Sequence, residues 1–510
     1  MAIFEWLAIV CLVCLAFGDL MVGVANDAVN FVNSAIGAKV ASRKVIMLVA
    51  SIGVIIGATF SDGIIEVARK GIFNPEFFTL QEAIILFTAA AMADLILLDL
   101  FSTFGLPTST TVSIVFEIFG AAFILALLKL GNLDQAWETI NSASAIKIIT
   151  GIFLSIGVAF IVAIIVQFIT RLLFTFDYHS RLKKWGFLWS GVALTCLFYF
   201  ILVVGGKHAT FMTEGTKGWI EGNLNMLLGS SLVVLSVISY TLIHRGVNIL
   251  KIIVLIGTGG LAMAFAGNDL ANFIGVSVGG VHAFLGADLS GTLPTPTWVL
   301  ILAGFVMAFS IFTSKKAKTV TSTEVNLASH KKSVTQQWKS NGFVEHLTRL
   351  ILFLYRGILR IFPKALLQTI KSRWTGTERN HLEETHSDFD LLRAAVNLMV
   401  SAVLISFATA HKLPLSTTYV TFMVAMGTAL TDGAWDRECA PHRIHGVLTV
   451  VSGWFITAFM AFLIAGVAVS ILYLFQMYGL LFLIVVTIVI IYKLYHLHEK
   501  RSVARVGNQG

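Results

Sequence analysis

The chain has few charged residues for its length, and it contains only four cysteines and seven prolines. Charged residues make up 13% of its 510 residues, whereas 57% are hydrophobic. A soluble globular protein of this size cannot bury so much apolar surface, which excludes that class. The cysteines are scattered and mostly lie in apolar segments, so they indicate neither a disulfide framework nor a zinc site.

The sequence also lacks the motifs of several function classes. It contains no Walker motif of an ATP-driven pump and no nucleophile–base pattern of an enzyme, so we expect a non-enzyme without a cofactor. The net charge of +8 lies mainly in loops between apolar segments, which suits a lipid bilayer and not nucleic acid. The N-terminus lacks the basic stretch of a signal peptide and is predicted to be a first span.

Apolar segments long enough to cross a bilayer recur along the chain. They predict an all-α polytopic protein of the cell (inner or plasma) membrane with about 12 transmembrane helices in two inverted repeats. The predicted spans are 4–25, 45–61, 82–104, 108–128, 146–172, 187–205, 225–243, 250–278, 298–313, 391–411, 414–430, 446–472 and 474–493. The segments that meet at Pro107 and Pro414 are expected to be half-helices or re-entrant hairpins, because proline interrupts a helix.

Loop charges predict the orientation of the chain. Lys and Arg cluster after the first and fifth spans, before the eighth, and in a long segment after the ninth. Because cytoplasmic loops carry an excess of these residues, the four regions are predicted to be cytoplasmic and the N-terminus to be outside.

One polar motif occurs twice inside the apolar segments. Asn-Asp-x-x-Asn-Phe stands at 26–31 and again at 268–273. A carboxylate and carboxamides within a membrane are costly unless they face a cavity, an ion or each other. Polar contacts between helices would explain one copy equally well, but two copies favour a binding site.

A second motif, Leu-Pro-x-Ser-Thr-Thr, stands at 106–111 and 413–418, and a glycine follows nine residues after each copy, at Gly120 and Gly427. Proline is well placed at the start of a helix, so the hydroxyls would lie at helix N-termini, where free N–H groups attract an anion. N-capping alone would explain a single copy. The two motifs recur in the same order and in opposite predicted orientations, which indicates an inverted repeat, a common transporter plan.

The four motif copies together supply ligands for both a cation and an oxyanion. Carboxylate and amide oxygens suit a small hard cation, whereas hydroxyls and helix N-termini suit the anion. The candidate ligands of a coupling cation are Asp27, Asn30, Asp269 and Asn272. The candidate anion-binding residues are Asn26, Asp27, Ser109, Thr110, Thr111, Asn268, Asp269, Ser416, Thr417 and Thr418.

At these motifs the sequence resembles the PiT family of inorganic phosphate transporters. That family's signature is a repeated Gly-x-Asn-Asp-x-x-Asn and a repeated Leu-Pro-x-Ser-Thr-Thr. The Asn-Asp-x-x-Asn part of the first motif and the whole of the second each stand twice in this chain. Residues 57–62 also look like the family's second-helix pattern. The resemblance implies import of phosphate coupled to Na⁺ or H⁺ by alternating access, with phosphate, the cation and lipid as partners and a homodimer as one possible assembly.

The chain departs from the family pattern at four places. Val49 lies near the position where the family often has Glu, and Val112 and Tyr419 stand where His commonly follows. In the first copy Gly23 stands three residues before Asn26, whereas in the second copy Gly267 directly precedes Asn268. The identity of the coupling ion therefore stays open, and a sulfate permease of the same fold is the alternative function. A passive anion channel is disfavoured, because paired carboxylates would repel anions from its pore.

The predicted organisation follows from the repeats and a basic insertion. The predicted parts are the first repeat (1–145), connecting helices (146–248), the second repeat in two pieces (249–313 and 391–472), a basic cytoplasmic insertion between them (314–390) and a C-terminal helix with its tail (473–510). Within the insertion, 345–371 is predicted to be an interfacial helix because its basic residues share one face, flanked by flexible linkers at 315–340 and 372–388.

Several other polar residues carry less information. Asp94, Asp99 and Glu117 lie in the third and fourth spans, where pairing within the bundle is favoured over a role as ion ligands or relay groups. His442 and His445, beside Arg443, are expected to lie in a solvated cytoplasmic loop.

Overall fold

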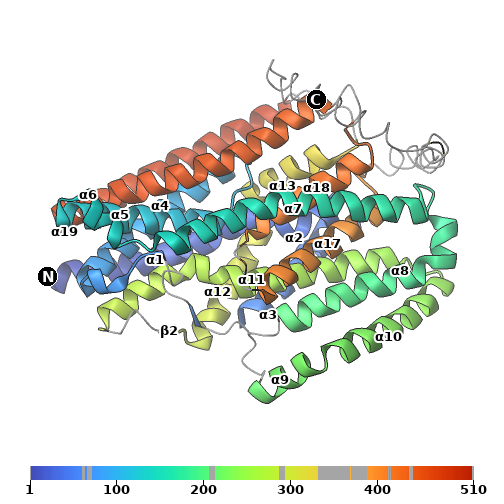
Figure 1. Cartoon of the computed structure of the whole chain (residues 1–510). Coiled ribbons are helices and arrows are strands. Elements are labelled where there is room, and N and C mark those ends of the chain that lie inside the picture. The colour runs from blue at the N-terminus through green and yellow to red at the C-terminus, as the bar shows by residue number, and fades with distance from the viewer. Residues whose placement is uncertain are drawn as a thin grey trace.

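The computed structural model is a bundle of long helices (Figure 1). It describes residues 2–59, 64–65, 72–205, 213–286, 293–330, 368, 387–411, 413, 415–435 and 440–507. Among these residues the strands are limited to a two-residue antiparallel pair, β1 (Ile64–Ile65) with β2 (Leu293–Pro294).

The helices follow the predicted spans closely. The first part of the chain forms α1 (Ala2–Asp27), α2 (Val29–Gly37), α3 (Arg43–Thr59), the short helix η1 (Pro75–Phe77), α4 (Leu80–Phe104), α5 (Thr110–Leu130), α6 (Leu133–Glu138) and α7 (Ser142–Phe174). The connecting part forms α8 (His179–Tyr199), η2 (Phe200–Gly205), α9 (Glu214–Gly222) and α10 (Leu224–His244). The second part forms α11 (Ile249–Phe284), α12 (Thr297–Thr313), α13 (Lys315–Ala328), α17 (Leu391–Ala410), α18 (Thr417–Thr431) and α19 (Ala440–Gly507).

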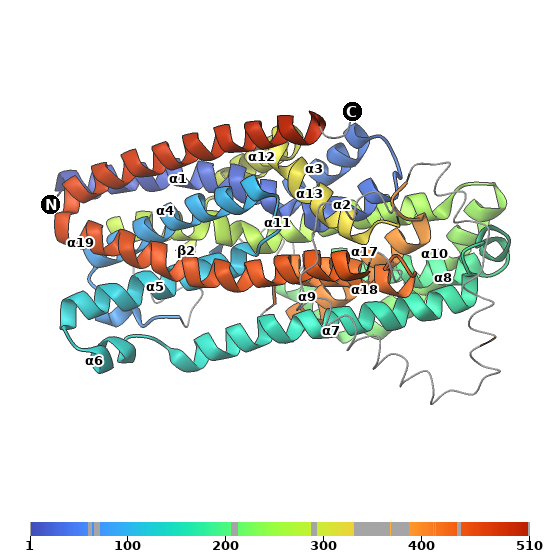
Figure 2. The ribbon, with the colours of Figure 1, turned by 90° about the horizontal axis from the view of Figure 1, so that it is seen from above.

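The longest helical stretch, α19, contains a turn. Gln476 has a φ of 44°, a left-handed conformation inside an otherwise helical run. Figures 1 and 2 show two long limbs that meet at the end of the molecule where the N-terminus lies. The two predicted spans 446–472 and 474–493 are therefore the two limbs of one helical hairpin.

In the described part of the chain, nine helices are long and apolar enough to cross a membrane, or ten when the bent pair α12 and α13 counts as one span. This makes the protein a multi-pass integral membrane protein. The count of about 12 stays a prediction, because α3 and α18 have only 17 and 15 residues and α19 counts once although it turns back.

Two helical hairpins approach each other from opposite ends of the bundle. The first is α4 and α5, and the second is α17 and α18 (Figure 2). At the first tip α4 ends at Gly105, which has a φ of 71°, and Ser109 caps α5. The same order of elements recurs at the second tip, where Ser416 caps α18. The predicted inverted repeat with broken helices is therefore confirmed.

The glycines that follow the two proline motifs allow close helix packing. A Cβ atom on Gly120 would lie 2.3 Å from the carbonyl oxygen of Phe462 in α19. A Cβ atom on Gly427 would lie 2.7 Å from the carbonyl oxygen of Phe160 in α7. In each repeat the second hairpin helix thus packs directly against the backbone of a long helix, and a side chain there would force the pair apart.

The positions of the turns agree with the predicted orientation. In Figure 2 the turns from α7 to α8 and from α10 to α11 lie at the end opposite the N-terminus. These turns carry two of the basic regions that were predicted to be cytoplasmic. That end is accordingly the expected cytoplasmic end of the molecule.

The prediction of a flexible linker at 315–340 is wrong for residues 315–328, which form α13. Ser314 caps this helix, since its Oγ accepts a hydrogen bond from the amide of Ala317 at 3.1 Å. The helix bends by 68° from α12 and buries one face, including Val320 and Glu324. That burial stabilises a helix that its polar composition alone would not favour. The predicted interfacial helix at 345–371 lies outside the described residues, apart from Gln368, as does most of the linker at 372–388.

The prediction of a solvated loop around His442 and His445 is also wrong, because both residues lie in the first turns of α19. Arg443 between them is 3% exposed. Its guanidinium donates to the carbonyl oxygens of Asn326 at 3.1 Å and Leu327 at 2.7 Å. These carbonyls end α13, so Arg443 satisfies groups that a helix terminus leaves without partners.

A buried ion cluster ties the second hairpin to α7. Nη2 of Arg171 lies 2.8 Å from Oδ2 of Asp390 and 2.6 Å from Oδ2 of Asp432. Asp390 directly precedes α17 and Asp432 directly follows α18. One arginine therefore holds both ends of the hairpin, and its side chain is only 1% exposed.

Candidate functional site

The two Asn-Asp motifs lie on long helices where the hairpin tips meet. The first spans the junction of α1 and α2, where the backbone of Ala28 stays helical, and the second lies inside α11. The two motifs lie side by side, because Gly23 packs against Phe273 so closely that a Cβ atom on Gly23 would lie 2.1 Å from the Phe273 ring. The chain breaks are therefore at the proline motifs, and the Asn-Asp motifs supply side chains from nearly continuous helices.

Asp27 joins the two hairpin tips. Its Oδ2 accepts a hydrogen bond from Oγ1 of Thr110 at 3.0 Å, and its Oδ1 accepts one from Oγ1 of Thr418 at 3.0 Å. Thr110 begins the first repeat's α5, whereas Thr418 belongs to α18 of the second repeat. Asp27 is fully buried. One carboxylate therefore connects both repeats.

Asp269 has the matching position in the second repeat. Its Oδ2 accepts a hydrogen bond from Oγ1 of Thr417 at 3.0 Å. In the aligned motifs Thr417 corresponds to Thr110, so each aspartate binds the first threonine of its own repeat. Asp269 is 3% exposed, and its charge acts on that of Asp27. The two negative charges therefore occupy one buried region.

The two asparagines cross between the repeats in the same symmetric way. Nδ2 of Asn30 donates to Oγ1 of Thr418 at 3.0 Å, and Nδ2 of Asn272 donates to Oγ1 of Thr111 at 3.0 Å. Each asparagine also lies close to its own aspartate, with Asn272 Nδ2 3.2 Å from Oδ1 of Asp269. The structure thus brings all four predicted cation ligands together.

Asn26 holds the first chain break in place. Its Nδ2 donates to Oγ of Ser102 at 3.0 Å and to the carbonyl oxygen of Leu106 at 3.1 Å, and its Oδ1 accepts from the amide of Thr108 at 2.9 Å. These contacts satisfy backbone groups that the break leaves without helical partners. Asn26 therefore positions the tip, and the side chain of its counterpart Asn268 lies outside the described residues.

The two serines of the proline motifs act as helix caps. Oγ of Ser109 accepts a hydrogen bond from the amide of Val112 at 3.2 Å, and Oγ of Ser416 accepts one from the amide of Tyr419 at 3.3 Å. A hydroxyl that accepts in this way can still donate its own hydrogen. The serines are therefore caps in this conformation, with a donor left for a ligand.

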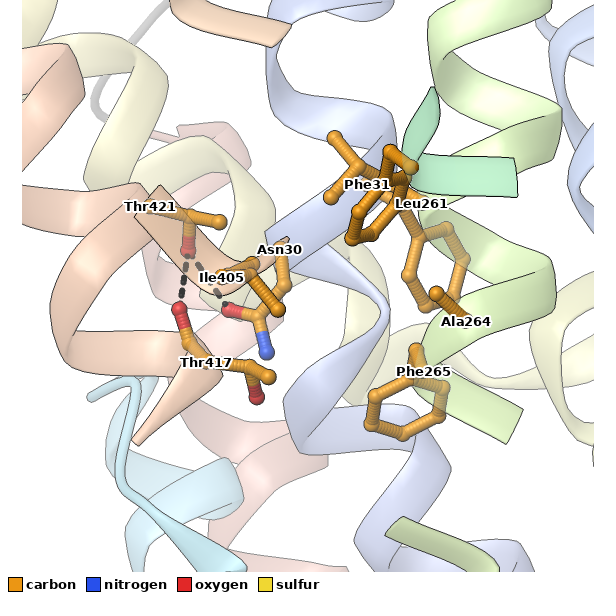
Figure 3. A pocket seen from close by; sticks show the side chains of 9 residues that line it. Asn30, Phe31, Leu261, Ala264, Phe265, Ile405, Thr417 and Thr421 are labelled. Atoms are coloured by element: carbon orange, nitrogen blue, oxygen red, sulfur yellow. Dashed lines mark hydrogen bonds between the residues drawn. The ribbon is translucent and has the colours of Figure 1, made fainter. Parts of the chain in front are cut away.

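A small pocket lies beside the crossing point (Figure 3). Asn30, Thr417 and Thr421 line one side of it, and the other side is apolar, with Phe31 and Phe265 among its residues. It has room for about one water molecule. A phosphate ion does not fit into it in this conformation.

Sequence analysis missed two contributors to the site. Thr421 donates from its Oγ1 to Oδ1 of Asn30 at 3.2 Å, and it lies one turn after Thr417 on the same face of α18. Trp454 of α19 donates from Nε1 to the carbonyl oxygen of Pro107 at 3.0 Å and stacks on Tyr419, with ring centroids 3.9 Å apart. The helical spacing from Thr417 could have indicated Thr421, whereas no sequence pattern indicates Trp454.

Replacing Asn26 tests its positioning role. We expect Asn26→Ala to lower stability by about 1–3 kcal/mol, because it leaves buried polar groups of the tip without partners. The thermal unfolding midpoint of the purified protein measures this change. Asn223→Ala is the control, since that side chain donates only to the carbonyl of Trp219 at an exposed helix end. Equal midpoints for both variants would contradict the role.

The sequence model of the phosphate transporter family matches residues 23–324, which is more than half of the chain. This chain belongs to the phosphate transporter family. The matched region contains both Asn-Asp motifs and the first proline motif, so it includes three of the four motif copies that meet at the site.

Similar proteins agree with this membership. A protein of Thermococcus kodakarensis named as a candidate phosphate permease is 30% identical over 323 residues, which cover 60% of this chain and 74% of that protein. A protein of Pyrococcus horikoshii, also named as a candidate phosphate permease, is 28% identical over a stretch that covers 59% of this chain and 73% of that protein. A solved structure titled "The sodium-dependent phosphate transporter" has a TM-score of 0.62 at 15% identity, covering 92% of this chain and 99% of that one, and it shows the shared fold.

Proposed function

We propose that this protein imports inorganic phosphate together with Na⁺ or H⁺ by alternating access. The observation that carries the proposal is the contact of two buried carboxylates, Asp27 and Asp269, with threonines at the tips of two inverted hairpins, where Asp27 contacts both tips. The hydroxyls and helix N-termini would bind the anion, and the carboxylates would bind the cation.

Charge balance explains why the anion and the cation would travel together. Among the described residues, Asp27 has hydroxyl and amide partners and forms no ion pair with Lys or Arg. An anion beside this buried charge would be repelled strongly in a medium of low dielectric constant. A cation bound at Asp27, Asn30, Asp269 and Asn272 removes that repulsion, which couples the two movements.

The same site favours phosphate over sulfate. A phosphate that carries a proton can donate it to a carboxylate oxygen, whereas sulfate has no proton to donate at neutral pH. A buried acceptor left without a partner costs about 1–3 kcal/mol. Phosphate should therefore outcompete sulfate for the site.

Conformational change is required because the pocket is too small for phosphate. Asp27 joins the tips through one hydrogen bond to Thr110 of α5 and one to Thr418 of α18, and such hydrogen bonds can open and close. Helices that enter from opposite ends give each side of the membrane its own hairpin, as alternating access at a repeat interface requires.

Uptake by the purified full-length protein in proteoliposomes tests the proposal. Labelled phosphate should accumulate when a Na⁺ or H⁺ gradient is imposed and should not accumulate without one. A tenfold excess of sulfate should compete weakly, which separates this function from that of a sulfate permease. Phosphate flux that is independent of both gradients would overturn coupling and favour a channel.

Removing the tip hydroxyls should weaken phosphate binding. We expect Thr110→Val and Thr417→Val each to raise the KM for phosphate roughly tenfold, because a hydrogen bond to a charged group contributes about 1.5–3 kcal/mol. The matched control is Thr258→Val, since that buried hydroxyl donates only to the Val254 carbonyl of its own helix, at 2.8 Å. An unchanged KM in both tip variants would exclude the threonines from the anion site.

A further inference from the structure

A group of three buried acidic side chains lies outside the central site. Asp19 of α1 is 2% exposed, Asp94 of α4 is 1% exposed and Glu117 of α5 is fully buried. All three come from helices of the first repeat that enter the bundle at the end where the N-terminus lies (Figure 2). Ionised carboxylates are costly inside a membrane protein, so such residues need a cation, a proton or a basic partner.

Asp94 and Glu117 lie close enough for their carboxyl groups to interact electrostatically. Two ionised carboxylates that lie close together in a buried site repel each other, so a proton on one of them removes this repulsion. Ser113 donates from its Oγ to Oε1 of Glu117 at 2.6 Å and so orients that carboxyl group.

Asp19 faces the pair from another helix. The negative charge of Asp94 acts on it, and Asp19 in turn acts on Glu117. Its buried Oδ1 has no hydrogen-bond partner among the described residues, and the same is true of Oδ1 of Asp94 and Oε2 of Glu117. Three carboxyl oxygens are therefore available at one place for a shared proton.

The charged residues on the neighbouring helices have other partners. Lys316 pairs with Asp99 at 2.6 Å, Lys129 pairs with Glu82 at 2.9 Å, Glu324 accepts from Asn33, and Arg443 donates to the end of α13. The remaining acids nearby are Asp27 and Asp269 of the central site. In the part of the chain that the structure describes, no Lys or Arg forms an ion pair with the three acids, so a proton is the simplest positive charge for them.

The position of the acids connects them to the central site. Asp19 lies eight residues before Asp27 on α1, which is about 12 Å along the helix. Glu117 lies seven residues after Thr110, about 10 Å along α5 in the same outward direction. Asp94 interacts electrostatically with both Asp19 and Asp27, so it connects the acidic group to the central site.

We propose that Asp19, Asp94 and Glu117 form a proton-binding site on the outer side of Asp27, and that this site is loaded and emptied as phosphate is transported. The proton comes from water at the outer end, is shared between the carboxyl groups, and leaves to water after transport. A proton here reduces the negative charge felt by Asp27. The link to transport rests on the proposed function, whereas the shared proton does not.

Infrared spectroscopy of the full-length protein in lipid tests the shared proton. The wild type should show a protonated-carboxyl band that shifts in D₂O and changes in intensity when inorganic phosphate is added. Asp94→Asn and Glu117→Gln, which keep the side-chain shapes, should each lose that part of the band. Asp99→Asn is the matched control, since it makes the same change on α4 at an acid paired with Lys316, and it should keep the band.

The outcomes separate the two proposals. An unchanged band in both Asp94→Asn and Glu117→Gln would overturn the shared proton, and a wild-type band that phosphate does not alter would overturn its loading during transport. If one variant fails to fold, as judged by size-exclusion chromatography, Asp19→Asn replaces it and should also alter the band. Failure of the wild type to take up labelled phosphate would overturn the proposed function, and the infrared band would still report on the proton.

Discussion

Asp27→Asn should reduce cation-driven phosphate uptake roughly 10- to 100-fold. The substitution keeps the shape of the side chain but removes the charge that binds a coupling cation. It also places an amide nitrogen where one of two hydroxyl donors, Thr110 or Thr418, now bonds. A hydrogen bond to a charged group contributes about 1.5–3 kcal/mol, which corresponds to that range of rates. Initial uptake rates in proteoliposomes, measured over a series of cation concentrations, provide the test.

Asp269→Asn should have an effect of similar size, because the two residues hold equivalent positions in the inverted repeats. Asp99→Asn is the control for both, since Asp99 lies on α4 with Lys316 as its partner, outside the crossing point. We expect the control to keep its cation dependence. If both site variants retained normal cation-driven uptake, the assignment of the carboxylates to the coupling cation would be wrong.

The sequence predicted the elements of the fold well because a membrane leaves a helix few alternatives. Backbone groups in lipid must be satisfied within the segment, so long apolar runs become helices whatever their neighbours are. The break at Pro107 followed from the chemistry of proline. The inversion followed from the loop charges together with the order of the motifs.

The pairing between the repeats could not be predicted from spacing. Asp27 and Thr418 are 391 residues apart in the chain, and the motifs alone do not say which tip contacts which aspartate. Trp454 belongs to no motif, yet it links the Pro107 carbonyl of one tip to the Tyr419 ring of the other. Such contacts depend on how α19 packs against both hairpins.

Polar segments were the other source of error. Composition predicted a linker at 315–340, although residues 315–328 form a helix with one buried face, including Glu324. The charged residues misled in the same way around Arg443, which is buried against the end of that helix. A polar average describes a solvated loop and a helix with one buried face equally well, and only the neighbouring helices decide between them.

Arg171→Met should destabilise the protein by about 3–5 kcal/mol. The arginine is buried between Asp390 and Asp432, so its removal breaks two buried ion pairs and leaves Arg393, 3.9 Å from Asp432, as the remaining arginine beside the two carboxylates. The thermal unfolding midpoint of the purified protein, followed by tryptophan fluorescence, measures the loss. Since these aspartates flank α17 and α18, the second hairpin should also become more accessible to protease than in the wild type.

Lys129→Met is the matched control for this loss. Lys129 also forms an ion pair, at 2.9 Å from Glu82, but its side chain is 33% exposed. A pair in contact with solvent contributes about 0–1 kcal/mol, so the control should shift the midpoint little. Arg171→Lys should fall between the two, because an ammonium keeps the charge but cannot bind two carboxylates with the planar fork of a guanidinium. Equal midpoints for Arg171→Met and Lys129→Met would show that the buried cluster does not hold the hairpin.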